Sequence, residues 1–216
     1  MKITGAIFDM DGTLLNSMDY WASVPCEYLI SLGIIPDGDC SKRFLEDGLR
    51  YWYEHEVRIH ALPKSLEQVS ADIYELMNQK YNTVVQLKRG AYEMLERLHS
   101  HGVKMCLATA TDRPTVEFIL DKLGIGKFFS RIFTSGEVGV GKRQPLIYQL
   151  ALEHLGTDKR TTYVFEDAIY AMRTAYTNGF KVVGVYDKNV FATEDEIKSL
   201  CHLYLDEDSE YRFDLD

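Results

Sequence analysis

The sequence predicts an α/β protein in which a doubly wound parallel (Rossmann-like) sheet carries an inserted small all-helical domain. Three observations support this fold class. The apolar run at residues 3–8 has the length of a buried strand. Residues 18–86 show apolar side chains at helical spacing and few strand signals. From Gly90 onward, helical and apolar strand-like segments alternate, which is typical of a parallel sheet covered on both faces. The predicted domains are therefore 1–17 with 87–216, and 18–86.

The composition indicates a globular protein of enzyme size. The 216 residues are 46% hydrophobic and 26% charged, enough to bury a substantial core. With 24 Lys and Arg against 33 Asp and Glu, the net charge is −9, which argues against broad binding to nucleic acid or anionic membranes. No apolar run approaches the roughly 18 residues of a membrane span. The scattered cysteines suggest neither a zinc site nor a disulfide framework, so we expect reduced thiols and a cytoplasmic location.

The helical domain is predicted from apolar spacing and one capping signal. Ser65 and Gln68 form a capping box that opens a helix extending through Met77. Trp52 lies among aromatic residues at helical spacing and is expected in the core of this domain. Further helical segments are predicted at 20–32, 44–49 and 51–53.

The α/β part is predicted from short apolar strands separated by helices. Pro114 falls in the first turn of a helix that begins near Asp112, and Thr193 with Glu196 forms another capping box. The acidic end from Asp206 is expected to be frayed and solvated. Strands are predicted at 103–109, 131–134, 162–165 and 181–186, and helices at 91–100, 144–155 and 168–177.

Polar side chains follow four of the predicted strands. In an open α/β sheet, ligands bind beyond the carboxyl ends of the strands, so these side chains are expected to converge. An isolated D-x-D would more often be a turn that caps backbone amides, but the convergence favours a site. Carboxylates, a lysine and hydroxyls together can hold a hard cation and bind a phosphate. The residues are Asp9 and Asp11, then Thr109 and Thr111, then Lys142, then Glu166 and Asp167.

A competing interpretation of Lys142 is a nucleotide-binding loop. Residues 136–142 fit the pattern G-x-x-x-x-G-K, whose backbone amides cradle phosphates. That loop needs Ser or Thr after the lysine to bind magnesium, whereas this chain has Arg143. The loop would also leave Asp9 and Asp11 without a role. We therefore interpret Lys142 as a cation for a phosphate or a carboxylate.

Four segments in order along the chain carry a family resemblance. They are residues 8–17 (FDMDGTLLNS), 107–111 (LATAT), 141–148 (GKRQPLIY) and 164–168 (VFEDA). They resemble the four motifs of the haloacid dehalogenase (HAD) superfamily of phosphohydrolases, in the helical-cap branch that includes beta-phosphoglucomutases and phosphoglycolate phosphatase-like enzymes. The resemblance spans almost the whole chain. It implies that residues 18–86 form a cap, with residues 13–17 as the hinge.

The resemblance also implies a role for each site residue. Asp9 would be the nucleophile that forms an aspartyl-phosphate, and Asp11 the general acid and then base. Thr109, Ala110 and Lys142 would bind the phosphoryl group and offset its charge. The implied ligands of a Mg²⁺ cofactor are Asp9, the main-chain carbonyl of Asp11, Asp167 and, directly or through water, Glu166. In the helical domain, Arg43 is a candidate substrate contact.

The resulting hypothesis is a Mg²⁺-dependent phosphatase that acts on a small phosphorylated metabolite. The nearest alternative is a beta-phosphoglucomutase-like phosphosugar mutase. Trp21 lies near the point where those mutases have a histidine, which favours hydrolysis. From a different class, phospho-accepting signalling domains also use an aspartate in a doubly wound sheet, but the predicted cap argues against that hypothesis.

Overall fold

The computed structural model describes residues 2–60, 62–209 and 211–213. The chain divides into two compact units, Met1–Asn16 with Gln86–Asp216, and Ser17–Val85. The domain ranges expected from the sequence differ from these units by one residue at each junction. Within the described residues, no helix has the length and apolarity needed to cross a membrane.

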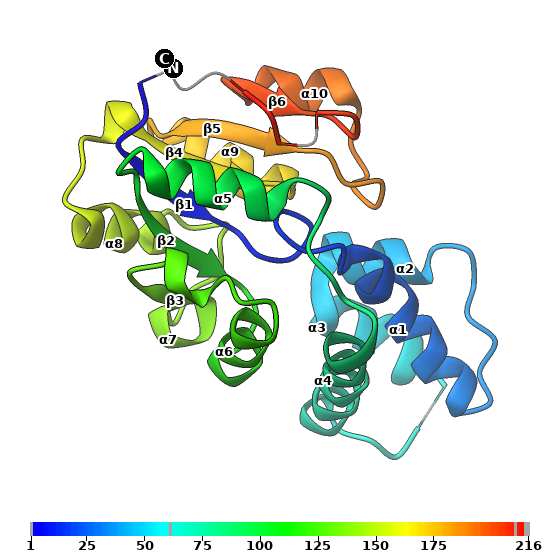
Figure 1. Cartoon of the computed structure of the whole chain (residues 1–216). Coiled ribbons are helices and arrows are strands. Elements are labelled where there is room, and N and C mark those ends of the chain that lie inside the picture. The colour runs from blue at the N-terminus through cyan, green and yellow to red at the C-terminus, as the bar shows by residue number, and fades with distance from the viewer. Residues whose placement is uncertain (1, 61, 210, 214–216) are drawn as a thin grey trace. The chain divides into compact units, whose positions relative to one another are not determined.

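The first unit is built on a parallel sheet, which confirms the predicted doubly wound fold (Figure 1). The strand order is β3-β2-β1-β4-β5-β6, so the first strand lies in the middle of the sheet, between β2 and β4. All five strand pairings are parallel. The strands are β1 (Gly5–Phe8), β2 (Lys104–Thr109), β3 (Ile132–Thr134), β4 (Thr162–Glu166), β5 (Lys181–Val185) and β6 (Leu203–Leu205).

Helices cover both faces of this sheet (Figure 1). The helix α5 (Ala91–Ser100) lies on one face, and α8 (Leu146–Leu155) and α9 (Ile169–Thr177) lie on the other. Asp112 caps α6 (Arg113–Lys122) with Pro114 in its first turn, and the capping box of Thr193 and Glu196 opens α10 (Glu194–Ser199), both as predicted. The remaining helical elements of this unit are η3 (Gly126–Phe128), α7 (Ser135–Val138) and η4 (Lys159–Thr161).

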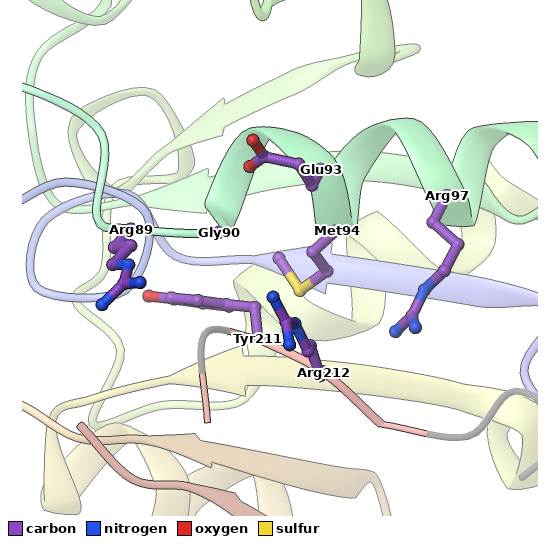
Figure 2. A pocket seen from close by; sticks show the side chains of 7 residues that line it. All are labelled: Arg89, Gly90, Glu93, Met94, Arg97, Tyr211 and Arg212. Carbon is purple, nitrogen blue, oxygen red and sulfur yellow. The ribbon is translucent and has the colours of Figure 1, made fainter. Parts of the chain in front are cut away.

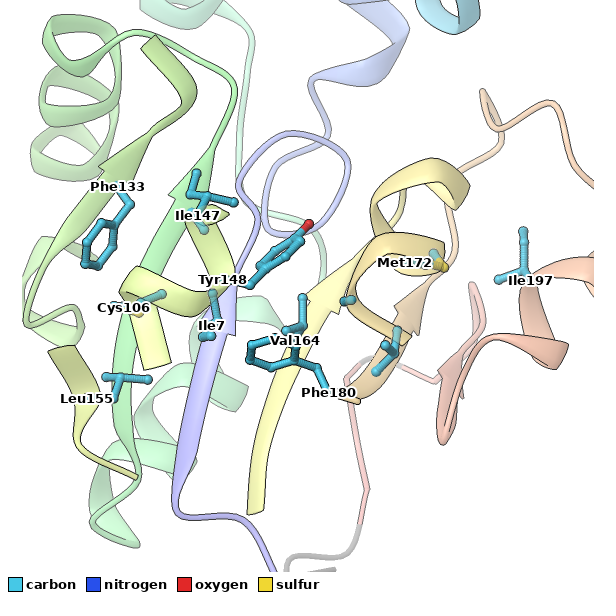
Figure 3. Packing of buried hydrophobic residues seen from close by; sticks show 14 residues of the cluster. Ile7, Cys106, Phe133, Ile147, Tyr148, Leu155, Val164, Met172, Phe180 and Ile197 are labelled. Carbon is cyan, nitrogen blue, oxygen red and sulfur yellow. The ribbon is translucent and has the colours of Figure 1, made fainter. Parts of the chain in front are cut away.

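The core follows from the alternation of side chains along each strand. Ile7, Cys106 and Val164 point to the face covered by α8 and α9, and each is fully buried (Figure 3). Their neighbours Phe8 and Phe165 point to the other face, where their rings stack with centroids 4.3 Å apart. Burial on both faces explains why these strands read as continuous apolar runs in the sequence.

The second unit is entirely helical in the part of it that the structure describes. Trp52 is fully buried and packs against Phe44 in a T-shaped arrangement, with ring centroids 5.7 Å apart, which confirms the expected core position. The capping box of Ser65 and Gln68 is present, and its helix continues beyond Met77 to Thr83. The elements are α1 (Met18–Ser31), α2 (Cys40–Lys42), α3 (Gly48–Trp52), α4 (Leu66–Thr83) and two π-helical stretches, η1 (Arg43–Asp47) and η2 (Tyr53–Val57).

Two features near the C-terminus differ from the sequence-based expectation. The strand β6 is only three residues long and pairs on one side alone, so it leaves little periodicity to detect. The expectation of a frayed end from Asp206 is wrong for Tyr211, which is only 6% exposed. Residues 210 and 214–216, which also belong to that expected tail, lie outside the described residues.

The capping box gives a first stability prediction. Replacing Ser65 with Ala removes the side chain that accepts from the Gln68 amide, and should destabilise the helical unit by about 1 kcal/mol. Both tryptophans of the chain, Trp21 and Trp52, lie in this unit, so urea unfolding followed by tryptophan fluorescence reports on it. Ser100→Ala, at the exposed end of α5 in the other unit, should leave that transition unchanged. If the wild type, Ser65→Ala and Ser100→Ala unfolded at the same urea concentration, the capping box of Ser65 would not stabilise the helical unit.

Candidate active site

The loop after β1 carries the two carboxylates of the first motif. The Asp9 amide donates to the Phe165 carbonyl at 3.0 Å, so Asp9 still follows the register of the sheet. The chain then turns at Gly12, whose φ of 79° lies in the left-handed region that glycine adopts without strain. Asp9 is 6% exposed, whereas Asp11 is half-buried. The loop therefore places one acid inside the protein and the other at its border.

Lys142 joins carboxylates from β1 and β4. Its Nζ donates to Asp9 Oδ1 and to Glu166 Oε1, the latter at 2.6 Å. Tyr148, on α8, donates its hydroxyl to the same Glu166 oxygen at 3.0 Å. Burial by itself lowers the pKa of Lys142, but the Asp9 and Glu166 carboxylates outweigh it and raise that pKa above its ordinary value. Lys142 is therefore a buried, charged ammonium group.

The acids of this cluster outnumber its lysine. Burial raises the pKa of Asp9 to about 7; Lys142 opposes that rise, and Glu166 and Asp11 add to it. Burial, followed by repulsion from Asp9 and Glu166, raises the pKa of Asp167 well above its ordinary value. Carboxylates that are held together in a buried site disfavour one another's charged forms. A positive charge in addition to Lys142 would relieve this repulsion.

The donor set fits a divalent cation. Carboxylate oxygens of Asp9, Glu166 and Asp167 lie within 4.8 Å of one another. Asp9 Oδ2 is buried and has no hydrogen-bond partner among the described residues, a costly arrangement for a carboxylate oxygen. Hard cations such as Mg²⁺ and Ca²⁺ prefer such oxygen ligands. The side chain of Asp11 is not part of this cluster. That the main-chain carbonyl of Asp11 binds the metal stays a prediction.

The end of β2 adds hydroxyl groups to the same edge of the sheet. Thr111 donates its hydroxyl to Asp11 Oδ2 at 2.7 Å and thereby orients this carboxylate. Its amide donates to Thr109 Oγ1 at 3.1 Å, and Thr109 is only 1% exposed. Ala110, between them, is exposed. The structure thus places all the predicted site residues of the first unit at one edge of the sheet.

Arg43 belongs to the other unit, where it has acidic partners of its own. Its Nε donates to Glu56 Oε1 at 2.7 Å, and its guanidinium group also pairs with Asp37. Its predicted contact with substrate stays a prediction.

Three residues near the site have no role in binding or catalysis among the sequence-based predictions. Thr13 donates its hydroxyl to Asp167 Oδ1 at 3.3 Å, and Tyr211 donates its hydroxyl to the Thr13 carbonyl. Tyr148 holds Glu166, as described above. Thr13 and Tyr148 lie inside the first and third of the four motifs, and that position is a sequence signal for a place near the site. Tyr211 lies well beyond the last motif, and no pattern in the sequence points to it.

The fold and this site define a protein of the doubly wound α/β class with a buried carboxylate, a lysine and a candidate cation site. The sequence model for haloacid dehalogenase-like hydrolases matches residues 3–175. The chain belongs to the haloacid dehalogenase-like hydrolases, and it is therefore an enzyme of the hydrolase class.

Curated relatives support this assignment. The chain is 30% identical over 190 residues to pyrophosphatase PpaX of Bacillus velezensis, covering 85% of this chain and 83% of that protein. It is 27% identical over 180 residues to the phosphorylated carbohydrates phosphatase of Thermotoga maritima, covering 83% of each. It is also 27% identical over 206 residues to the bifunctional riboflavin kinase/FMN phosphatase of Arabidopsis thaliana, covering 93% of this chain. The chain spans about half, 54%, of the Arabidopsis protein.

Solved structures show the same fold. CbbY from Rhodobacter sphaeroides, determined in complex with phosphate, aligns with a TM-score of 0.78 at 20% identity and covers 94% of this chain and 93% of its own. A hydrolase from Pseudomonas syringae aligns with a TM-score of 0.75 at 24% identity, covering 95% and 94%.

The buried cluster predicts a large stability effect at Lys142. Lys142→Met leaves the Asp9 and Glu166 carboxylates without their cation, and should reduce the free energy of unfolding by about 3–5 kcal/mol at neutral pH. Chemical denaturation followed by far-UV circular dichroism measures this loss. Lys198→Met is the matched control, because it removes an ion pair with Glu194 that is exposed on α10 and should cost far less. Similar losses in the two variants would show that the buried network is not specially stabilising.

Proposed function

We propose that the chain is a Mg²⁺-dependent phosphatase that hydrolyses a small phosphate monoester through an aspartyl-phosphate on Asp9. The observation that carries this proposal is the state of the Asp9 carboxylate. It is buried at the end of the central strand, one oxygen is held by Lys142, and the other has no partner among the described residues. This arrangement suits a nucleophile that works beside a cation.

The names of the relatives support the same class of reaction. PpaX is a pyrophosphatase, and the Thermotoga and Arabidopsis proteins are named as phosphatases of phosphorylated carbohydrates and of FMN. A further relative, from Escherichia coli, is a fructose-1-phosphate phosphatase that is 25% identical over 189 residues. Their common chemistry is cleavage of a small phosphate compound, so we propose a small phosphorylated metabolite as the substrate.

The metal would be held by Asp9, Asp167 and Glu166, together with the main-chain carbonyl of Asp11. Mg²⁺ fits this set because it prefers oxygen ligands and commonly occurs in sites that bind phosphate. When bound, the ion supplies positive charge that lets the phosphate dianion approach the Asp9 carboxylate. Glu166 would be oriented by Tyr148 and Lys142, both of which donate to its Oε1.

In the first step, a carboxylate oxygen of Asp9 attacks phosphorus, and the bond from phosphorus to the leaving oxygen breaks. Asp11 gives its proton to that oxygen, so the product leaves as an alcohol. Lys142 and Thr109 bind phosphoryl oxygens and offset the negative charge of the transition state. Thr111 keeps Asp11 oriented through its hydrogen bond to Oδ2.

In the second step, a water molecule attacks the phosphorus of the aspartyl-phosphate. Asp11, now ionised, accepts a proton from the water, and the bond between phosphorus and Asp9 breaks. Inorganic phosphate leaves, Asp9 is again a carboxylate, and Asp11 is again protonated. The half-buried position of Asp11 suits this role, because an acid at the border can meet both the leaving group and water.

Two other hypotheses remain to be compared. A phosphosugar mutase would use the same two aspartates but would return the phosphoryl group to the sugar instead of to water. A phospho-accepting signalling domain is disfavoured, because the chain belongs to a family of hydrolases. Supplying a glucose phosphate separates the enzymatic hypotheses: isomerisation without net release of inorganic phosphate would establish the mutase.

The roles of the two aspartates are separable by substitution. Asp9→Asn removes the nucleophile and should reduce turnover below about 0.1% of the wild-type rate. Asp11→Asn removes the proton carrier and should reduce turnover by about 10²–10⁴-fold. The measurement is inorganic phosphate released from a panel of phosphorylated metabolites with Mg²⁺, and Asp158→Asn, at an exposed ion pair with Arg160, is the control. Unchanged turnover in Asp9→Asn would refute the mechanism.

The metal dependence has its own test. Removing divalent cations with a chelator should abolish phosphate release, and adding Mg²⁺ back should restore it, because the site otherwise holds more negative charge than Lys142 balances. Full activity in the chelator-treated protein would contradict the proposed role of the metal.

A further inference from the structure

Two cysteines of the helical unit lie in contact. The Sγ atoms of Cys26, on α1, and Cys40, at the start of α2, are 2.8 Å apart, with the Cys26 thiol as donor. Cys40 is fully buried and also accepts from Trp52 Nε1 at 3.4 Å. Cys26 is half-buried, 3.3 Å from the Ser41 hydroxyl. Both thiols are free, and nothing in the proposed phosphatase mechanism uses them.

We propose that Cys26 and Cys40 form a reversible disulfide by exchange with a low-molecular-weight disulfide such as oxidised glutathione. The Cys26 thiolate attacks one sulfur of the small disulfide, which breaks its S–S bond and releases one thiol. The Cys40 thiolate then attacks the Cys26 sulfur of the mixed disulfide and releases the second thiol. Two protein thiols lose two electrons and two protons, and the small disulfide gains them.

The geometry supports both steps. A disulfide bond is about 2.0 Å long, so the two sulfurs need to approach by less than about 1 Å. Cys26 is the entry point because it is partly accessible, whereas Cys40 is enclosed. Burial raises the pKa of the Cys40 thiol to about 12, which makes its thiolate scarce and the second step the slower one. The bond would tie α1 to α2 and constrain the unit that contains them.

Mass spectrometry of the full-length chain tests this proposal. The protein is incubated with oxidised glutathione near pH 8, denatured, alkylated and digested. We expect peptides containing Cys26 and Cys40 to be joined, with both protected from alkylation until a reductant is added. Cys106 and Cys201 belong to the other unit and should remain alkylated singly.

Two variants act as controls. Cys26→Ser should prevent the link and leave Cys40 as an unmodified thiol, because Cys40 is too enclosed to react with glutathione directly. Cys201→Ser should form the link as the wild type does. Persistent glutathione on Cys26 without a link, or a link that joins another pair of cysteines, would overturn the proposal.

An independent observation concerns Tyr211. Its hydroxyl donates to the main-chain carbonyl of Thr13, and the Thr13 hydroxyl donates to Asp167 Oδ1 at 3.3 Å. Tyr211 has a φ of 58°, a left-handed conformation that is uncommon for a residue other than glycine. It is also the only non-glycine residue with positive φ among those that the structure describes. The residue that makes this contact thus has an unusual backbone conformation.

Neighbouring contacts fix the segment that carries Tyr211. The ring of Phe213 lies 5.0 Å from the Arg97 guanidinium group and 6.1 Å from the ring of Phe165. A cavity of about 370 Å³ is lined by Tyr211 and by residues of α5 that include Met94 and Arg97 (Figure 2). Phe165 directly precedes Glu166, so the segment is anchored close to the acidic cluster.

We infer that Tyr211 is a positioning residue for the metal site. By holding the Thr13 carbonyl, it fixes the loop after β1 and so directs the Thr13 hydroxyl to Asp167, a proposed metal ligand. Groups that orient a metal ligand commonly change metal affinity by about 10–100-fold when they are removed. The inference rests on the proposed cation site, and it extends the active site beyond residues 3–175, which the family match covers.

Tyr211→Phe removes only the hydroxyl and tests this role. We expect its affinity for Mg²⁺, measured by isothermal titration calorimetry without substrate, to fall about 10-fold. In turnover assays, the concentration of Mg²⁺ needed for half activity should rise by the same factor, with KM for substrate unchanged. Tyr53→Phe is the matched control, because Tyr53 also donates to a backbone carbonyl, that of Lys64 at 2.8 Å, but in the other unit.

The outcomes are distinguishable from failure of the proposed function. A wild-type chain that binds Mg²⁺ but releases no phosphate would refute the phosphatase, and the calorimetry would still decide the role of Tyr211. Thr13→Val, which removes the hydroxyl that reaches Asp167, should weaken Mg²⁺ binding as Tyr211→Phe does. Affinity within twofold of the wild type in either variant, or an equal loss in Tyr53→Phe, would overturn the inference.

Discussion

The buried ammonium group of Lys142 is the constraint on which the site depends. It holds Asp9 at the end of β1 and Glu166 at the end of β4, and it lies on neither strand. Breaking such a network is costly, because it leaves an uncompensated charge in a medium that solvates charge poorly. The loop after α7 must therefore return Lys142 to the middle of the sheet, and Tyr148 on α8 contributes a further donor there.

The sheet order makes this convergence possible. Because β1 lies between β2 and β4, Asp9, directly after β1, and Thr109 and Glu166, at the ends of β2 and β4, follow neighbouring strands. More than a hundred and fifty residues nevertheless separate Asp9 from Glu166. Parallel pairing brings their carboxyl ends to one edge, and burial on both faces keeps the strands rigid. The proposed catalytic groups thus follow strands that are paired on both sides, whereas the turn at Gly12 leaves Asp11 half-buried.

Much of this arrangement could be predicted from the sequence, for identifiable reasons. The helix 91–100 and the capping boxes at Ser65 and Thr193 follow local rules, and the structure has them as predicted. The convergence of Asp9, Thr109 and Lys142 followed from the rule for strand ends in open α/β sheets. The short edge strand β6 could not be predicted, because three residues are too few to show an alternating pattern. Hydrogen-bond geometry, such as the bond from Thr111 to Asp11, depends on loop conformations that no local pattern encodes.

Tyr211 shows why the remaining part of the site could not be predicted. Its segment is acidic and lacks apolar periodicity, which are the features of a solvated end. Three contacts that are remote in sequence override them: Tyr211 with Thr13, Phe213 with Arg97, and Phe213 with Phe165. None of them leaves a local pattern in the sequence, because the partners lie on different elements. A backbone conformation that is unfavourable for tyrosine can persist there, since the surrounding contacts determine it more strongly than local preference does.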